Sequence, residues 1–249
     1  MFGWFTGNKE TDPYSAAKAG DAEAQNMRAV ACALGAGVKQ DYVEAAKWYQ
    51  KAADQGHAIA RYNLGTMYLL GQGVKQNAAN GFDLILASAN QGLADAQARI
   101  ANMYLMGIGT APNAEMAAKW YMLAAKQGLP EAEYWVGLLY GSGTGFQMNA
   151  QEAFFWCRSA AEKGFAEAQL KLASNYEEGL WVGENNEEAV NWYRKAATQG
   201  LASAQMALGR AYEKGIGVEK NVKEARYWIN LAAKQGDKFA KNYLETLPL

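Results

Sequence analysis

Residues 56–74 read Gly56-His-Ala-Ile-Ala-Arg-Tyr-Asn-Leu-Gly-Thr-Met-Tyr-Leu-Leu-Gly-Gln-Gly-Val74, and the rest of the chain repeats this pattern. The stretch begins with a glycine, continues with apolar residues at helical spacing, and stops at a Gly-x-Gly. The opening glycine returns every 36 residues without an insertion, at Gly20, Gly56, Gly92, Gly128, Gly164, Gly200 and Gly236. Self-similarity at a fixed period of this length is the signature of a solenoid.

The composition indicates a helical protein without membrane spans. Half of the 249 residues are apolar and only 4 are proline, which favours helices. A net charge of −1 argues against a broad nucleic-acid surface, which needs clustered Lys and Arg. No apolar run approaches the roughly 18–20 residues of a membrane span, and the first residues do not read as a signal peptide. We therefore expect a cytoplasmic protein with no membrane insertion.

The first half of each 36-residue unit predicts one helix. Counting from the opening glycine, position +4 is always alanine, position +8 is almost always aliphatic, and position +9 is always small. Position +12 is tyrosine in Tyr68, Tyr104, Tyr140, Tyr176 and Tyr212. These spacings mark one face of a helix, and the small residue allows a neighbouring helix to approach closely. The glycine at +15 is expected to end the helix as a left-handed cap.

The second half of each unit predicts another helix. It starts after an N-cap residue at +21, namely Asp41, Asn77, Asn113, Asn149, Asn185 or Asn221. An alanine at +25 in most units and an alanine pair at +32 and +33 then mark its buried side. Tryptophan stands at +28 as Trp48, Trp120, Trp156, Trp192 and Trp228, and we interpret these residues as core anchors.

The fold class predicted from this pattern is all-α, an α-solenoid of antiparallel helix pairs. Neither helix of a pair can bury its apolar face alone, so stacking must stabilise the chain. We expect a flexible N-terminus over residues 1–12 and a single solenoid over residues 13–247. It contains six full repeats, and capping helices are expected at Pro13–Ala19 and at about Lys238–Glu245.

Two units depart from the pattern. In the second, Gly81 replaces the alanine at +25 and Leu84 replaces the tryptophan at +28. In the fifth, Trp181 replaces the second glycine of the Gly-x-Gly. Local repacking explains both departures, and a bend or a binding loop at Trp181 is the alternative.

The repeated motif resembles that of the Sel-one-like repeat (SLR) family, which is related to tetratricopeptide repeats. Its clearest copy runs from Ala204 to Gly217 and continues through Asn221 and Ala225 to Gly236. The resemblance implies a right-handed superhelix. It also implies a role as an adaptor or assembly platform, and some bacterial members are immunity proteins against secreted toxins. A secreted branch carries a disulfide in each repeat, which this chain lacks.

The two cysteines are predicted to remain unpaired. Cys32 lies in the first unit and Cys157 in the fourth. Packed helices are spaced by about 8–10 Å, so three units separate these residues by far more than the roughly 7 Å that a disulfide allows between Cα atoms.

Catalysis has little support in the sequence. His57 is the only histidine, so no histidine pair is available for a metal, and its place beside a glycine suggests a surface cap. The Gly-x-Gly copies lack the preceding strand and the lysine of a phosphate-binding loop. We expect no catalytic residues, no cofactor site and no metal site. An uncommon hydrolase is the alternative from another class.

A binding surface is predicted on the first helix of each unit. The arc opposite the buried positions holds +3, +6, +10, +13 and +14, which line the concave groove in tetratricopeptide relatives. In the middle units these positions are apolar where water is expected: Tyr62, Leu69, Leu70, Leu105, Met106, Tyr134 and Leu138. Such a patch usually marks a partner.

The leading hypothesis is a non-catalytic scaffold that binds a protein or an extended peptide in this groove. An immunity protein that neutralises one toxin is a second hypothesis. Two other interpretations of the apolar stripe remain open. Superhelical curvature would bury it against neighbouring helices, or it would mediate self-association.

Overall fold

The computed structural model describes residues 13–247, and within this range every regular element is a helix. The predicted all-α repeat class is confirmed. The expectation of a flexible segment over residues 1–12 lies outside the described residues.

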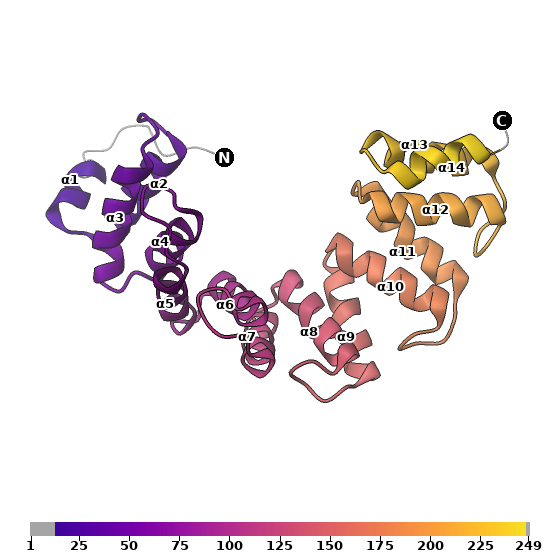
Figure 1. Ribbon diagram of the computed structural model, residues 1–249, viewed down its shortest axis with the longest axis horizontal. Helices are drawn as coiled ribbons and strands as arrows, with labels where there is room; N and C mark the ends of the chain where they lie inside the picture. Colours follow the sequence, from indigo (N-terminus) through magenta and orange to yellow (C-terminus); the bar gives the residue numbers. More distant parts are fainter. Residues whose placement is uncertain (1–12, 248–249) are drawn as a thin grey trace. The chain divides into compact units, whose positions relative to one another are not determined.

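Each 36-residue repeat contains two helices, as predicted (Figure 1). The first helices of the pairs are α2 (Ala22–Leu34), α4 (Ala58–Leu70), α6 (Ala94–Met106), α8 (Pro130–Ser142), α10 (Ala166–Glu178) and α12 (Ala202–Lys214). The second helices are α3 (Tyr42–Asp54), α5 (Ala78–Ala89), α7 (Ala114–Lys126), α9 (Ala150–Glu162), α11 (Asn186–Thr198) and α13 (Val222–Lys234). The terminal helices α1 (Pro13–Ala19) and α14 (Lys238–Thr246) confirm the two predicted capping helices.

The helices fall into two larger structural units, each containing several repeats, which we call the first and second units from here on and describe separately. The first unit extends to Asn113 and contains α1 to α6, and the second starts at Ala114 and contains α7 to α14. Within each unit, every helix packs against the helix that precedes it and the helix that follows it. The handedness of the solenoid remains a prediction.

The predicted helix ends are formed by the expected residues. The Asp41 carboxylate accepts a hydrogen bond of 2.9 Å from the Glu44 N–H at the start of α3. At the end of α4, Gly71 has a φ of 68° and its N–H bonds to the Met67 carbonyl. This left-handed conformation suits glycine, because it has no Cβ to strain.

The small residue at +9 permits close helix packing, as the sequence indicates. A Cβ on Gly65 would lie 2.7 Å from Ile85 Cγ1 and 2.9 Å from the Gly81 carbonyl oxygen. Helices α4 and α5 therefore meet almost backbone to backbone.

The residues at +9 and +29 alternate between neighbouring repeats, so the sequence has a second period of two repeats. The first, third and fifth repeats have alanine at +9 and tyrosine at +29, and the others have glycine at +9 and a smaller residue at +29. The alanine and tyrosine residues are Ala29 and Tyr49, Ala101 and Tyr121, and Ala173 and Tyr193. The glycine pairs are Gly65 and Ile85, Gly137 and Cys157, and Gly209 and Ile229. The Cβ atoms missing from these glycines make room for β-branched or compact partners.

Buried glutamines connect the first helix of a repeat to the preceding helix and to the end of the same repeat. Gln25 Nε2 donates to the Ala17 carbonyl at 3.1 Å, and Gln55 Nε2 donates to Gln25 Oε1 at 2.8 Å. The Gln55 amide also reaches the Gly20 carbonyl at 2.9 Å. The same clasp recurs in the pairs Gln169–Gln199 and Gln205–Gln235. In the fourth repeat an ion pair takes its place, with Lys163 Nζ 2.6 Å from Glu133 Oε1.

The tryptophans at +28 are less uniform than the core-anchor interpretation implies. Trp48 and Trp192 are buried, whereas Trp120, Trp156 and Trp228 are half-buried. The indole N–H groups of Trp156 and Trp228 bond to glutamates one turn earlier in their helices, at 3.0 Å and 3.1 Å. The interpretation therefore holds fully for two of the five residues.

The departure from the repeat pattern at Trp181 is accommodated by the absence of a side chain at Gly141. Trp181 keeps the positive φ of the glycine that it replaces, at 63°, and its ring packs onto Gly141 of α8. A Cβ on Gly141 would overlap this ring. Lys171 Nζ lies 5.0 Å from the centre of the indole. Local repacking thus explains this loop.

Candidate protein-binding surface

The seven predicted groove residues differ in exposure. Leu70 and Met106 are exposed, at 57% and 60%. The other five are half-buried: Tyr62, Leu69, Leu105, Tyr134 and Leu138. The residues from Tyr62 to Met106 belong to the first unit, and Tyr134 and Leu138 belong to the second.

Leu69 has a packing partner that accounts for its partial burial. A Cβ on Gly81 would lie 2.7 Å from Leu69 Cδ2, so the leucine side chain fills the space of the usual alanine at +25. The departure at Gly81 is therefore local repacking between α4 and α5. Leu69 contributes to this packing, and it is a poor place to test binding by mutation.

Tyr134 packs within the second unit. Its ring centre is 5.4 Å from that of Phe165 and 6.0 Å from that of Trp135. It lies against the core cluster that contains Cys157, and burial raises the pKa of its hydroxyl. The tyrosines at +6, Tyr62 and Tyr134, occur in repeats whose residue at +29 is isoleucine or cysteine instead of tyrosine.

Positions +3 and +14 are exposed in all six first helices, and they form the exposed stripe. It includes Leu34 of α2, 72% exposed, and Ile59 of α4, 45% exposed. Position +7 is exposed only at Met27, at 49%. The predicted arc contains Leu34 at +14 and Ile59 at +3, but it misses Met27 at +7 because it uses +6 instead. Position +6 is buried in Asn26, Ala98 and Met206, which shows that it turns toward neighbouring helices.

The residues on the stripe are apolar in the first unit and polar in the second at position +14. In the first unit its +14 residues are Leu34, Leu70 and Met106, all exposed. In the second unit the +14 residues are Ser142, Glu178 and Lys214, also exposed. The face is therefore aliphatic at the C-terminal ends of the first-unit helices and polar in the second unit.

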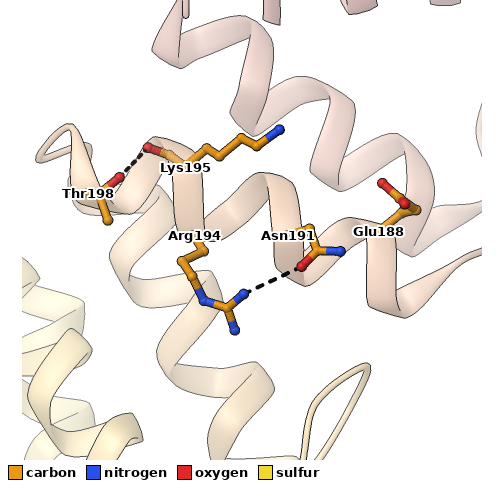
Figure 2. A pocket seen from close by; sticks show the side chains of 5 residues that line it. All are labelled: Glu188, Asn191, Arg194, Lys195 and Thr198. Atoms are coloured by element: carbon orange, nitrogen blue, oxygen red, sulfur yellow. Dashed lines mark hydrogen bonds between the residues drawn. The ribbon is translucent and has the colours of Figure 1, made fainter. Parts of the chain in front are cut away.

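A shallow depression on α11 has only polar lining residues: Glu188, Asn191, Arg194, Lys195 and Thr198 (Figure 2). Three of their groups already have local partners. Arg194 Nη2 donates to the Tyr212 hydroxyl at 3.1 Å, Lys195 Nζ lies 3.6 Å from the centre of the Trp192 ring system, and Thr198 Oγ1 donates to the Lys195 carbonyl. The depression holds no nucleophile paired with a base.

His57 is a helix cap, as its position suggested. Its Nδ1 accepts a hydrogen bond from the Ala60 N–H at 3.2 Å, and its Nε2 lies 2.9 Å from Glu23 Oε2. Among residues 13–247 no group of three or more His, Cys, Asp and Glu side chains is arranged to hold a metal ion. Over the same range, no helix has the length and apolar content needed to cross a membrane.

Both cysteines are free, as predicted, and both are buried. Burial raises the pKa of the Cys157 thiol from 9.0 to about 12 and also raises that of Cys32. The Cys157 Sγ lies 3.6 Å from the Ala168 carbonyl, to which it donates. The raised pKa means that folding favours the neutral thiol of Cys157. This thiol therefore contributes fully to the free energy of unfolding below pH 9, and the contribution is lost as the pH rises through 12.

The native chain is therefore expected to react very slowly with a thiol reagent. At pH 8 the shift lowers the thiolate fraction of Cys157 by about a thousandfold, and burial also blocks access. Absorbance after addition of Ellman's reagent measures the reaction, with urea-unfolded chain as the control in which both thiols react at once. Rapid labelling of both thiols in folded protein would contradict this burial.

Comparisons with known proteins agree with this architecture. The Sel1 repeat model matches six times in succession, over residues 22–57, 58–93, 94–129, 130–165, 166–201 and 202–237. A search of curated proteins finds no match.

Several solved structures are similar. A Sel1 repeat protein from Oxalobacter formigenes is 34% identical, with a TM-score of 0.80 over 88% of this chain and 86% of that one. A protective antigen of uropathogenic Escherichia coli, which displays an SLR fold, is 32% identical with a TM-score of 0.90 over 94% of this chain. The chain spans about half of that antigen, 51%.

An immunity protein from Pseudomonas aeruginosa is 22% identical, with a TM-score of 0.54 over 92% of this chain and 87% of that one, and shares the fold alone. The six consecutive matches cover most of the sequence and coincide with the observed helix pairs. The chain is a member of the Sel1 repeat family.

Proposed function

We propose that this protein is a non-catalytic scaffold that binds a protein or an extended peptide on the exposed face of its first helices. Sel1 repeat proteins generally mediate protein–protein interactions. We also propose that it acts in the cytoplasm, and that nucleic acid is not its partner.

One observation carries the proposal. In the first unit, large apolar side chains stand on the exposed face of the first helices without a covering element in the described chain. Leu70 and Met106 are more than half exposed, and Leu105 is half-buried beside them. Exposed apolar side chains that gather on one face usually mark a site for a macromolecular partner.

An immunity protein would be one specific form of such a binder. The likeness to the Pseudomonas aeruginosa immunity proteins supports this alternative through the fold alone. An adjacent toxin gene, and binding of the purified toxin to this chain, would favour it over a general scaffold.

The test is affinity capture with the full chain, identification of bound proteins by mass spectrometry, and calorimetry with the purified partner. Two variants alter the exposed face of the first helices, Leu70→Glu with Met106→Glu in the first unit and Glu167→Lys with Glu178→Lys in the second. At least one variant should weaken binding about tenfold or more, because central interface residues carry most of the affinity.

The matched control changes the second helices. Val43 in α3 and Phe155 in α9 are 53% and 60% exposed, so Val43→Glu with Phe155→Glu adds similar charge on another face. This control should fold and bind like the unmodified chain. If both first-helix variants still bind the partner and the control variant does not, the binding site lies elsewhere and the proposal is refuted.

A further inference from the structure

Two departures from the repeat pattern meet at one contact in the second unit. Position +17 is glycine in every complete repeat except the fifth, where it is Trp181, and position +13 is glycine only in the fourth, at Gly141. The indole packs onto Gly141, where a Cβ would lie 2.8 Å from Trp181 Cε2 and 2.9 Å from Cη2. The missing side chain therefore leaves a space on α8 that accommodates an aromatic ring, and we call this space the Gly141 hollow.

A cation lies over the ring that fills the hollow. Lys171 belongs to α10, and its Nζ is 5.0 Å from the centre of the Trp181 ring. A lysine ammonium within about 6 Å of an aromatic ring is attracted to the negative face of that ring, and tryptophan gives the strongest attraction. The hollow and the lysine together favour an indole over an aliphatic side chain.

The backbone at Trp181 opposes the present position of the ring. Trp181 has a φ of 63°, and among the described residues it is the only one other than glycine with a positive φ. This left-handed conformation strains a residue with a Cβ, because the Cβ comes too close to the following carbonyl oxygen. An indole supplied by another molecule would make the same contact without this strain.

The hollow lies at the edge of the proposed binding face. Gly141 directly precedes Ser142, the exposed +14 residue of α8, and the side chain of Trp181 is half-buried. Leu180, which precedes the tryptophan in the loop, is 45% exposed. A partner bound along the first helices of the second unit therefore lies next to the hollow.

We propose that Trp181 occupies the place of a partner's tryptophan. Its ring fills the Gly141 hollow in the free chain, and a tryptophan side chain of the bound partner displaces it and lies under Lys171 instead. Displacement lowers the apparent affinity by the fraction of chains in which the hollow is open. This inference rests on the proposed function, and it adds one site that determines specificity and the side chain that fits it.

The first experiment empties the hollow with Trp181→Gly, which restores the glycine of the other repeats. The probe is N-acetyl-L-tryptophanamide, and NMR titration of the ¹⁵N-labelled chain should show saturable shifts of the Gly141 and Lys171 amide signals. N-acetyl-L-leucinamide should bind at least about tenfold more weakly, because it offers no aromatic ring to the lysine or the hollow. The unmodified chain should bind the tryptophan probe at least about tenfold more weakly than the variant, because the Trp181 ring competes.

Two additions to Trp181→Gly test the recognition itself. Gly141→Ala should abolish saturable binding, because the new Cβ takes the place of the ring. This variant should fold, since Gly141 belongs to a helix and alanine favours helices over glycine. Lys171→Met should weaken binding about two- to fivefold, as expected for the loss of one exposed cation–π contact. Circular dichroism checks that each variant keeps its helices.

Three results with the probe would overturn the inference. These are a folded Trp181→Gly chain that does not bind the tryptophan probe saturably, equal binding of the leucine probe, and equal binding by the variant that also carries Gly141→Ala. Equally tight binding by the unmodified chain would show that Trp181 does not close the hollow, and it would overturn the inference too.

The captured partner gives an independent measurement that does not require Trp181→Gly to fold. In the unmodified chain labelled with 5-fluorotryptophan, the Trp181 fluorine signal is identified by its absence from Trp181→Phe, and the partner should shift it. An unshifted signal in the saturated complex would contradict displacement. If the signal stays unshifted while the first-helix variants weaken binding, this inference fails and the proposed function stands.

Discussion

Replacing Gly73 by alanine is expected to lower the free energy of unfolding by about 4 kcal/mol, because two costs add at this residue. Gly73 has a φ of 67°, a left-handed conformation that strains any residue with a Cβ. A Cβ at Gly73 would also overlap the carbonyl oxygen of Tyr42, at the start of the second helix in the preceding repeat. Backbone atoms cannot move aside as a side chain can, so the two repeats would have to separate.

The chain contains its own control for this experiment. Gly37 occupies the same position in the first repeat with a φ of 72°, but a Cβ there would meet no atom within 4 Å. Gly37→Ala should therefore cost only the conformational penalty of about 1–2 kcal/mol. Urea unfolding followed by circular dichroism measures both variants. Equal destabilisation by the two substitutions would show that the contact between repeats contributes nothing.

The same contact explains why Trp181 is an informative exception. Glycine at +17 lies against the preceding repeat in Gly73, Gly109, Gly145 and Gly217, where an added Cβ would overlap a carbonyl oxygen. Trp181 carries a full side chain at this position, and the fifth repeat places its ring on Gly141 instead. The motif alone shows that the glycine is missing, but only the packing shows which surface receives the indole.

The helix pairs could be predicted from the sequence because their ends depend on local chemistry. An asparagine side chain caps a helix through bonds to residues two or three positions later, as Asn149 does with the N–H groups of Gln151 and Glu152. The left-handed glycine after each first helix also acts locally. Six copies at constant spacing then fix how many pairs there are.

The exposed face was harder to predict because it depends on which neighbouring helix covers each position. A helical wheel places +6 and +7 only about 100° apart, so sequence alone does not decide which of them turns outward. In the structure Met27 at +7 is exposed and Asn26 at +6 is buried. The alternation of successive repeats at +9 and +29 also escapes a search for a 36-residue pattern, since it depends on pairs such as Gly209 and Ile229.

The glutamine clasp shows how a repeated polar residue can be overlooked. Gln25, Gln169 and Gln205 stand at the same position and are buried, yet glutamine is usually exposed. Its recurrence together with Gln55, Gln199 and Gln235, which lie 30 residues later in each case, was the available signal. Each pair joins the first helix of a repeat to the end of the same repeat, and the buried glutamine also donates to a carbonyl of the preceding helix, as Gln25 does to Ala17.

In the fourth repeat, a buried carboxylate, Glu133, replaces the glutamine, and a single cation, Lys163, balances its charge. The Glu133 side chain is only 4% exposed, while that of Lys163 is 41% exposed. Lys163 Nζ also donates to the Gly128 carbonyl at 3.3 Å, and Ser159 Oγ donates to Glu133 Oε2 at 3.0 Å. Without the lysine, the carboxylate would retain one neutral donor and no compensating charge.

Lys163→Met is therefore expected to destabilise the chain by about 2–3 kcal/mol, below the usual cost of breaking a fully buried pair because water reaches the lysine. The double change Glu133→Gln with Lys163→Gln recreates the neutral clasp of the first, fifth and sixth repeats, and it should restore most of the lost stability. Urea unfolding of the single and double variants measures the coupling. If the double variant is no more stable than Lys163→Met, the loss comes from the lysine's packing and its bond to Gly128. A rescue would show that this position in the stack requires a matched pair, and that either a charged or a neutral pair can supply it.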